Sequence, residues 1–259
     1  MLIRKRRRYT FGPNCEVFMF PIVFQHPDFV VINKPAGISV HRDDNLHGLT
    51  AQVAEQLGVS QVWLVHRLDK MTSGLLILAL NAKAAAELSG LFAQRNVEKF
   101  YIALSDKQPR RKQGKICGDM ARSRRGTWKL LASQQNPAVT QYFSAGTGAG
   151  LRLFILRPAT GKTHQIRVAL KSEGAAILGD PLYGSAEYGP GKLADRGYLH
   201  AWQLRFTYQG MQYQVSALPE AGQCFALSGV LQQLAQWAEP WTLPWPAVRV
   251  PAATDDESE

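Results

Sequence analysis

Residues 62–80 read VWLVHRLDKMTSGLLILAL, a polar turn between two apolar runs. Val62–Val65 predicts a short strand, and the unbroken apolar run Leu75–Leu80 predicts a strand that is buried on both faces. His66–Gly74 between them is a dense cluster of different polar side chains. Loops that carry several functional groups on a rigid scaffold are frequent sites of catalysis. The sequence therefore predicts a functional centre at this turn, with Asp69 as a simple turn-forming residue as the plainer alternative.

The rest of the chain mixes strands and helices. Alternating or continuous apolar patterns predict strands at residues 29–33, 98–105, 139–143, 151–156, 199–208 and 211–217. Apolar residues at helical spacing predict helices at residues 49–57, 81–96, 163–171 and 230–237. This order, with hairpins among the strands, favours an α+β fold over a parallel doubly wound sheet. Within the strand 98–105, alternation places Tyr101 on the face opposite Phe100 and Ile102.

The composition of the chain excludes some classes of protein and indicates which kind of partner it binds. The chain has 259 residues, 46% of them hydrophobic, which excludes disorder of the whole chain. Its longest apolar runs, Val17–Phe24 and Leu75–Leu80, are shorter than the roughly 18–20 residues that span a bilayer. The formal charge of +10 favours a polyanionic partner, with a generic basic protein as the alternative. An acidic membrane would need a basic amphipathic helix, and none is evident, so nucleic acid is the expected partner.

The charge is unevenly distributed. We expect a basic flexible arm at residues 1–18, one folded domain at 19–250 that includes the C-terminal helix, and an acidic disordered tail at 251–259. Residues 106–129 are strongly basic and show little periodicity, which predicts a basic arm that grips phosphates or a solvated mobile loop. The basic residues there are Lys107, Arg110, Arg111, Lys112, Lys115, Arg122, Arg124, Arg125 and Lys129.

The cysteines and the N-terminal residues give an indication of the cellular compartment. Cys15, Cys117 and Cys224 lie far apart without a C-x-x-C pair, so neither a disulfide framework nor a zinc site is predicted. The basic start is not followed by an apolar stretch of the length that a secretory signal needs. A cytoplasmic protein is therefore expected.

Six segments, in order, resemble the motifs of the RluA-type pseudouridine synthases. They are Asn33–Gly37 (NKPAG), His66–Gly74 (HRLDKMTSG), Glu98–Ala103 (EKFYIA), Gly161–Val168 (GKTHQIRV), Ile177–Gly184 (ILGDPLYG) and Leu199–Ala201 (LHA). The resemblance covers roughly residues 20–218. It implies a pseudouridine synthase fold, with a long, mixed, mostly antiparallel sheet flanked by helices. It also implies an enzyme that isomerises a uridine in structured RNA, either ribosomal or transfer RNA, without cofactor or metal.

The resemblance assigns roles to residues. Asp69 corresponds to the family's nucleophile, Arg167 to the cation that keeps this carboxylate ionised, and Tyr101 to the residue that stacks on the extruded base. Whether Asp69 attacks the sugar or the base is left open. The remaining candidates are expected to bind RNA: Arg67, His66, Lys99, Lys162, His164, Arg124 and Arg125. Arg67 in particular is expected to hold the RNA with the target base flipped out of its stack.

Two departures from the family pattern stand out. Ala169 replaces a histidine that many members carry, and too few residues precede the catalytic domain for an N-terminal S4 domain. RNA selection is thus expected from the catalytic body, the 106–129 segment and the tails. Near the C-terminus, Trp241 and Trp245 are candidates for stacking on bases, whereas Trp237 is expected in the core. The expected state is a monomer. The rival interpretation is a catalytically silent RNA-binding or RNA-remodelling protein on the same scaffold.

Overall fold

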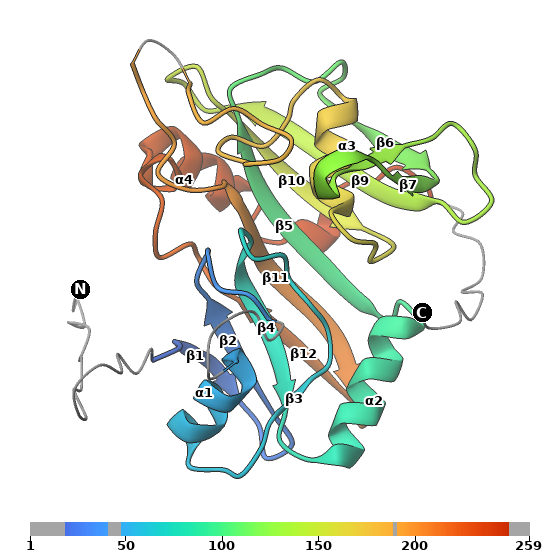
Figure 1. Cartoon of the computed structure of the whole chain (residues 1–259), viewed down its shortest axis with the longest axis vertical. Coiled ribbons are helices and arrows are strands. Elements are labelled where there is room, and N and C mark those ends of the chain that lie inside the picture. Colours follow the sequence, from blue (N-terminus) through green and yellow to red (C-terminus); the bar gives the residue numbers. More distant parts are fainter. Residues whose placement is uncertain (1–18, 41–47, 189–190, 249–259) are drawn as a thin grey trace.

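A computed structural model describes residues 19–40, 48–188 and 191–248 (Figure 1). The arm expected at 1–18 and the tail expected at 251–259 lie outside the described residues, as does Cys15. Among the described helices, none has the length and apolar character to cross a membrane.

One ten-stranded sheet organises the described chain. Its strands follow the order β1-β2-β4-β11-β5-β10-β9-β6, while β12 pairs with β11 and β3 with β4. All pairs are antiparallel except the β11–β4 pair, which is parallel. The strands are β1 (Ile22–Gln25), β2 (Phe29–Lys34), β3 (Trp63–Leu64), β4 (Ser73–Ala79), β5 (Val97–Ser105), β6 (Gln113–Gly118), β9 (Ala138–Gly146), β10 (Arg152–Pro158), β11 (Leu199–Tyr208) and β12 (Met211–Ser216). In Figure 1, β5 and β11 run through the middle of the molecule.

A separate hairpin and several helices complete the fold. The hairpin consists of β7 (Met120–Arg122) and β8 (Trp128–Leu130). The helices are α1 (Leu49–Leu57), α2 (Ala82–Ala93), α3 (Gln165–Ser172) and α4 (Ser228–Gln236), with short 3₁₀ turns η1 (Arg124–Gly126), η2 (Gln223–Ala226) and η3 (Pro240–Thr242). The predicted α+β class and the mixed, mostly antiparallel sheet are confirmed.

Side chains that alternate along the strands form a buried apolar cluster on each face of one half of the sheet. Phe29 and Val31 of β2 belong to one buried cluster, which includes Leu88 of α2. Val30 and Ile32 belong to the opposite cluster, which includes Val53 of α1. Because successive side chains of a strand point to opposite faces, a strand with a helix on each side must be apolar throughout. Burial on both faces therefore explains the unbroken apolar runs of β2 and β4.

The other half of the sheet packs against α3 and α4. Their buried residues, such as Leu170 and Leu234, share a cluster with Phe154 of β10. Trp237 belongs to this core, as expected from the sequence. Trp245 also packs against it, whereas the guanidinium of Arg205 lies 5.1 Å from the ring centroid of Trp241.

The sequence analysis missed the strands within residues 106–129, and its alternative of a mobile loop is wrong, whereas phosphate binding by this segment stays a prediction. Most of the segment is ordered structure: β6 pairs with β9 at the edge of the sheet, and residues 120–130 form the β7–β8 hairpin. Ile116 is buried while Lys115 beside it is not. An edge strand tolerates such charges because one side faces solvent, so the charge density hid the strand pattern. Helix α2 also ends earlier than predicted, before Arg95 adopts a left-handed backbone conformation at φ 62°.

A close backbone contact fixes the start of β4. Gly74 has φ of 113°, and a Cβ at this position would lie 2.2 Å from the carbonyl oxygen of Ala201 in β11. Ala201 in turn pairs with Tyr101 of β5. Glycine is therefore required where the chain leaves the polar turn, because only glycine lets β4 approach β11 this closely.

We expect Gly74→Ala to lower the free energy of unfolding by about 3 kcal/mol, because it adds both a backbone strain and a steric overlap. Urea denaturation followed by circular dichroism measures the change. Gly90→Ala is the matched control, since Gly90 lies inside α2 with open space around it. That substitution should raise stability by about 0.5–1 kcal/mol. Equal effects of the two substitutions would contradict the close contact.

Candidate active site

An ion-paired cluster lies at the turn between β3 and β4. The Nη1 of Arg167, in α3, is 3.1 Å from Oδ2 of Asp69. The Nε and Nη2 of Arg167 each lie 2.8 Å from an oxygen of Asp180. The Arg167 side chain is 4% exposed and that of Asp180 is fully buried, whereas Asp69 is 19% exposed. The guanidinium thus links a fixed internal carboxylate to one that reaches solvent.

Asp180 holds the guanidinium in place. Its Oδ1 also accepts hydrogen bonds from the backbone N–H groups of Leu182 and Tyr183, at 2.9 and 3.2 Å. The fork of Arg167 meets both oxygens of Asp180, a two-point contact that fixes orientation as well as position. The sequence analysis quoted Asp180 within a motif without assigning it to the site. The signal that could have found it is a lone charged residue in the otherwise apolar stretch Ile177–Gly184, since a buried carboxylate needs a cation nearby.

The charges of Arg167 and Tyr101 are set by their surroundings. Burial works to lower the pKa of Arg167, but the hydrogen bonds and charges of Asp180 and Asp69 outweigh it and raise the pKa above its usual value. Burial, followed by the negative charge of Asp69, raises the pKa of the Tyr101 phenol. Arg167 is therefore a permanent cation, and Tyr101 is an uncharged phenol near neutral pH.

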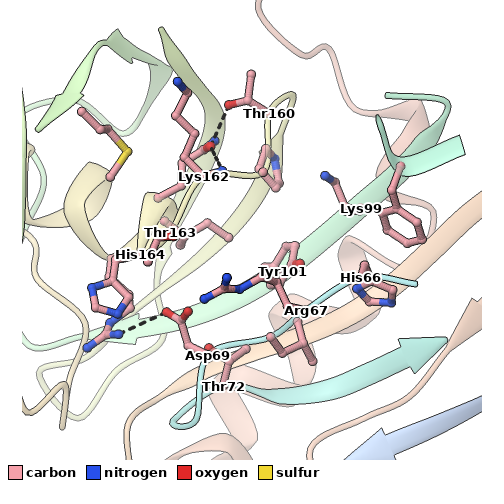
Figure 2. A pocket seen from close by; sticks show the side chains of 18 of the residues that line it. His66, Arg67, Asp69, Thr72, Lys99, Tyr101, Thr160, Lys162, Thr163 and His164 are labelled. Carbon is pink, nitrogen blue, oxygen red and sulfur yellow. Dashed lines mark hydrogen bonds and ion pairs between the residues drawn. The ribbon is translucent and has the colours of Figure 1, made fainter. Parts of the chain in front are cut away.

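These side chains line a cavity of about 740 Å³. Eight of the ten residues predicted for the site line it: His66, Arg67, Asp69, Lys99, Tyr101, Lys162, His164 and Arg167. Figure 2 shows Asp69, Arg67 and Tyr101 between two groups, His66 and Lys99 on one side and Lys162, Thr163 and His164 on the other. Arg124 and Arg125 do not line the cavity; they are exposed on the turn between β7 and β8.

Burial alters two of the predicted RNA-binding residues, His66 and Lys99. The Nε2 of His66 accepts a hydrogen bond from the backbone N–H of Ile77, and its ring stacks on Phe92 at 4.2 Å. Burial, then the charge of Lys99, lowers the pKa of His66 to about 3, so its ring is neutral. Burial and then Arg95 lower the pKa of Lys99 to about 8.

A tyrosine that the sequence analysis did not single out connects three segments. The hydroxyl of Tyr183 lies 2.9 Å from Nδ1 of His164 and accepts a hydrogen bond of 2.7 Å from the backbone N–H of Trp128. Its ring centroid lies 5.0 Å from the guanidinium carbon of Arg167. Burial, followed by Arg167, lowers the pKa of His164 below its usual value. Nothing in the local sequence indicates these contacts, because the partners lie 16 or more positions away.

The loop before α3 is held by a buried amide. Gln165 accepts hydrogen bonds from the Thr160 hydroxyl and the Lys162 backbone N–H, and donates to the carbonyl of Val139. These bonds fix the loop that carries Lys162 and His164. No group of three or more His, Cys, Asp or Glu side chains in the described parts of the chain is placed to hold a metal ion.

Residues 28–172 match the family model described as RNA pseudouridylate synthase. The chain belongs to this family. An uncharacterised RNA pseudouridine synthase of Haemophilus influenzae is 54% identical over 213 residues, which are 82% of this chain and 93% of that protein. The ribosomal large subunit pseudouridine synthase D of Zymomonas mobilis is 35% identical over 205 residues, 72% of this chain and 64% of that protein.

Solved structures agree with this family. Human RNA pseudouridylate synthase domain containing 1 has a TM-score of 0.68 and 26% identity, and the match covers 92% of this chain and all of that chain. Human RNA pseudouridylate synthase domain containing 4 has a TM-score of 0.63 and 27% identity, covering 83% and 93%. The resemblance to RluA-type enzymes that the sequence motifs indicated is confirmed, and the chain is an RNA-modifying isomerase.

We expect Asp180→Asn to lower kcat about 10- to 100-fold, because the guanidinium of Arg167 loses one of its two charged anchors and its fixed direction toward Asp69. Stability should fall by about 3 kcal/mol, since a buried cation loses a partner. Isomerisation assays and urea denaturation measure the two effects.

Asp106→Asn is the matched control for this substitution. Asp106 pairs with the exposed Lys107 at 3.1 Å, and an ion pair of this kind contributes about 0–1 kcal/mol. A normal kcat in Asp180→Asn would show that Arg167 is oriented without Asp180.

Proposed function

We propose that this enzyme converts a specific uridine of ribosomal RNA to pseudouridine, with Asp69 as the nucleophile and the target base flipped out of its stack. The observation that carries the proposal is the Asp69–Arg167 pair at the floor of an open cavity: the carboxylate is accessible, and its partner is a permanent buried cation. The names of relatives such as the large subunit pseudouridine synthase of Zymomonas mobilis support ribosomal RNA as the substrate class.

The geometry suits a carboxylate that attacks. The Nη1 of Arg167 donates a hydrogen bond of 3.1 Å to Oδ2 of Asp69, and this charged contact holds the carboxylate in a fixed position. Only Oδ2 of Asp69 contacts Arg167, so Oδ1 is the oxygen directed to the reaction in this proposal. The glycosidic C1′–N1 bond of uridine breaks, the base turns, and a C1′–C5 bond forms. The proton leaves C5 and N1 gains a proton, so the reaction is an isomerisation without an external reactant.

Tyr101 stacks on the extruded uracil in this proposal. It lies on the central strand β5 and faces the cavity, while Phe100 and Ile102 point into the protein. Its uncharged phenol offers an aromatic face and one O–H group beside the Asp69 carboxylate. Stacking on an aromatic ring compensates for part of the few kcal/mol that unstacking the base costs.

The cations around the cavity hold the RNA backbone. Arg67 is exposed at the cavity, whereas Lys99 and Lys162 are half-buried along its walls. Contacts of Lys and Arg with phosphates supply affinity and make it dependent on salt. In this proposal Arg67, next to Leu68 and Asp69 on the same turn, helps to hold the RNA with the target base flipped out.

Tritium release from RNA labelled at uridine C5 tests the reaction. The RNA comes from a strain that lacks this gene, and wild type is compared with Asp69→Asn. We expect release by wild type and a loss of more than about 1000-fold in Asp69→Asn, because a neutral amide is no nucleophile. RNA binding by Asp69→Asn should remain near wild type. Turnover of Asp69→Asn at the wild-type rate would overturn the role of Asp69.

The same assay on fractionated RNA identifies the substrate. Release from ribosomal RNA and none from transfer RNA is the expected result. Release from transfer RNA alone would reject the proposed substrate class but keep the reaction. Absence of release from every fraction, with an active related synthase as the control, would reject the proposed activity.

We expect RNA affinity to fall as pH rises above about 8, because Lys99, whose pKa is lowered to about 8, loses its charge there. The ammonium group of Lys99 is charged below that pH and neutral above it. Its neighbours do not replace the lost charge, because Arg95 disfavours the charged form of Lys99 and the ring of His66 is neutral. Anisotropy titrations from pH 6.5 to 9.5 measure the change. Lys99→Arg is the control, because arginine stays charged and should abolish the dependence. An unchanged pH profile in Lys99→Arg would exclude Lys99 as its origin.

A further inference from the structure

The β7–β8 hairpin presents one face to the active-site cavity. Met120 pairs with Leu130, and Arg122 pairs with Trp128, so these four residues share a face. Met120 and Trp128 line the cavity together with Asp69, while Leu130 packs against the core. The hairpin thus forms a wall of the cavity, and Trp128 belongs to that wall.

Trp128 is unlike the tryptophans that stabilise the fold. Trp237 lies in the core and Trp245 packs against it, but Trp128 belongs to none of the three hydrophobic clusters of the described residues. Its described ring contact is the guanidinium of Arg122, 5.7 Å from the ring centroid. The indole is half-buried and lines the cavity. A large aromatic ring placed in this way contributes little to the core and is available to a ligand.

The backbone that carries this ring is anchored close to Arg167 and Asp69. The backbone N–H of Trp128 donates to the Tyr183 hydroxyl at 2.7 Å, and Tyr183 is buried, in contact with both His164 and Arg167. Arg167 in turn contacts Asp69. The anchored backbone keeps the indole in the same cavity as Asp69.

The chemistry of the hairpin matches a nucleic acid. Arg122, Arg124, Arg125 and Lys129 are all exposed on it, so phosphates are attracted to the same element that carries the indole. Single-stranded RNA is typically bound by this combination of cations and a stacking ring.

We propose that Trp128, supported by Arg122, stacks on an unpaired base next to the target uridine and makes the β7–β8 hairpin a specificity element. The inference rests on the proposed function, because it names a second nucleotide subsite of the same cavity. Tyr101 takes the target base, and Trp128 takes a neighbour, so the enzyme reads unpaired sequence around the uridine.

The test measures binding to two seven-residue RNA probes with fluorescein labels. One has a uridine flanked by three adenosines on each side, and the other has abasic sites in place of the adenosines, so the phosphates are unchanged. The protein carries Asp69→Asn, which separates binding from turnover. We expect Trp128→Ala to weaken binding of the adenosine probe about tenfold and to leave the abasic probe unchanged.

Two further variants separate the effect of base stacking from the effect of side-chain volume. Trp128→Phe keeps an aromatic face and should retain most of the affinity for the adenosine probe, whereas Trp128→Leu keeps an apolar side chain and should lose it. Lys129→Ala is the matched control on the same strand. It removes a charge and should weaken both probes by the same factor.

Three results would overturn the inference. The first is equal affinity for both probes in the protein with an intact Trp128. The second is an equal decrease in affinity for both probes in Trp128→Leu. The third is an unchanged affinity for the adenosine probe in Trp128→Leu. Tritium release by wild type distinguishes these failures from a failure of the proposed function. Release together with any of these three results rejects the role of Trp128 alone, and absence of release rejects the activity.

Discussion

The bridge from Arg167 to two carboxylates is the interaction on which the site depends. It joins helix α3 to the 177–184 turn, with 13 positions between Arg167 and Asp180, and to the β3–β4 turn, with 98 positions between Arg167 and Asp69. Placing charges inside a protein is costly, and the cost is met only when each one is paired and hydrogen-bonded. Asp180 satisfies this condition with the guanidinium and two backbone N–H groups. The accessible carboxylate of Asp69 is held in position by this internal arrangement.

The sheet brings Tyr101 to the same cavity. β4 runs parallel to β11 where Ala201 is the partner of Gly74, and β11 pairs Ala201 with Tyr101. Three adjacent strands therefore set the separation between the turn that carries Asp69 and the aromatic face of Tyr101. The side chains at this crossing are small because the backbones approach closely. The position of Tyr101 is a property of the sheet, whereas Asp69 lies on the turn before β4, and Lys162 and His164 lie on the loop before α3.

Local patterns were enough to predict much of the fold and part of the site. The apolar runs of β2 and β4 and the spacing of α1 follow from burial on regular elements, so their residues could be assigned from the sequence. Tyr101 could be placed on the cavity face because strands alternate. The contacts of Asp180 and Tyr183 could not, since they join residues distant in sequence. Charges on residues 106–129 hid an edge strand and a hairpin, because those strands bury too little to show a clear apolar pattern.

The difference in exposure between Arg167 and the cations of the β7–β8 hairpin determines how strongly dissolved ions act on each. Arg167 is 4% exposed, so mobile ions do not approach it, whereas the lysines and arginines of the hairpin stand in solvent. Screening acts strongly on exposed charges and weakly on buried ones. Ionic strength therefore weakens the attraction of the hairpin for a polyanion, while the Arg167–Asp180 contact inside the protein stays nearly constant. The same change in salt thus acts on the surface of the cavity wall and leaves the internal bridge intact.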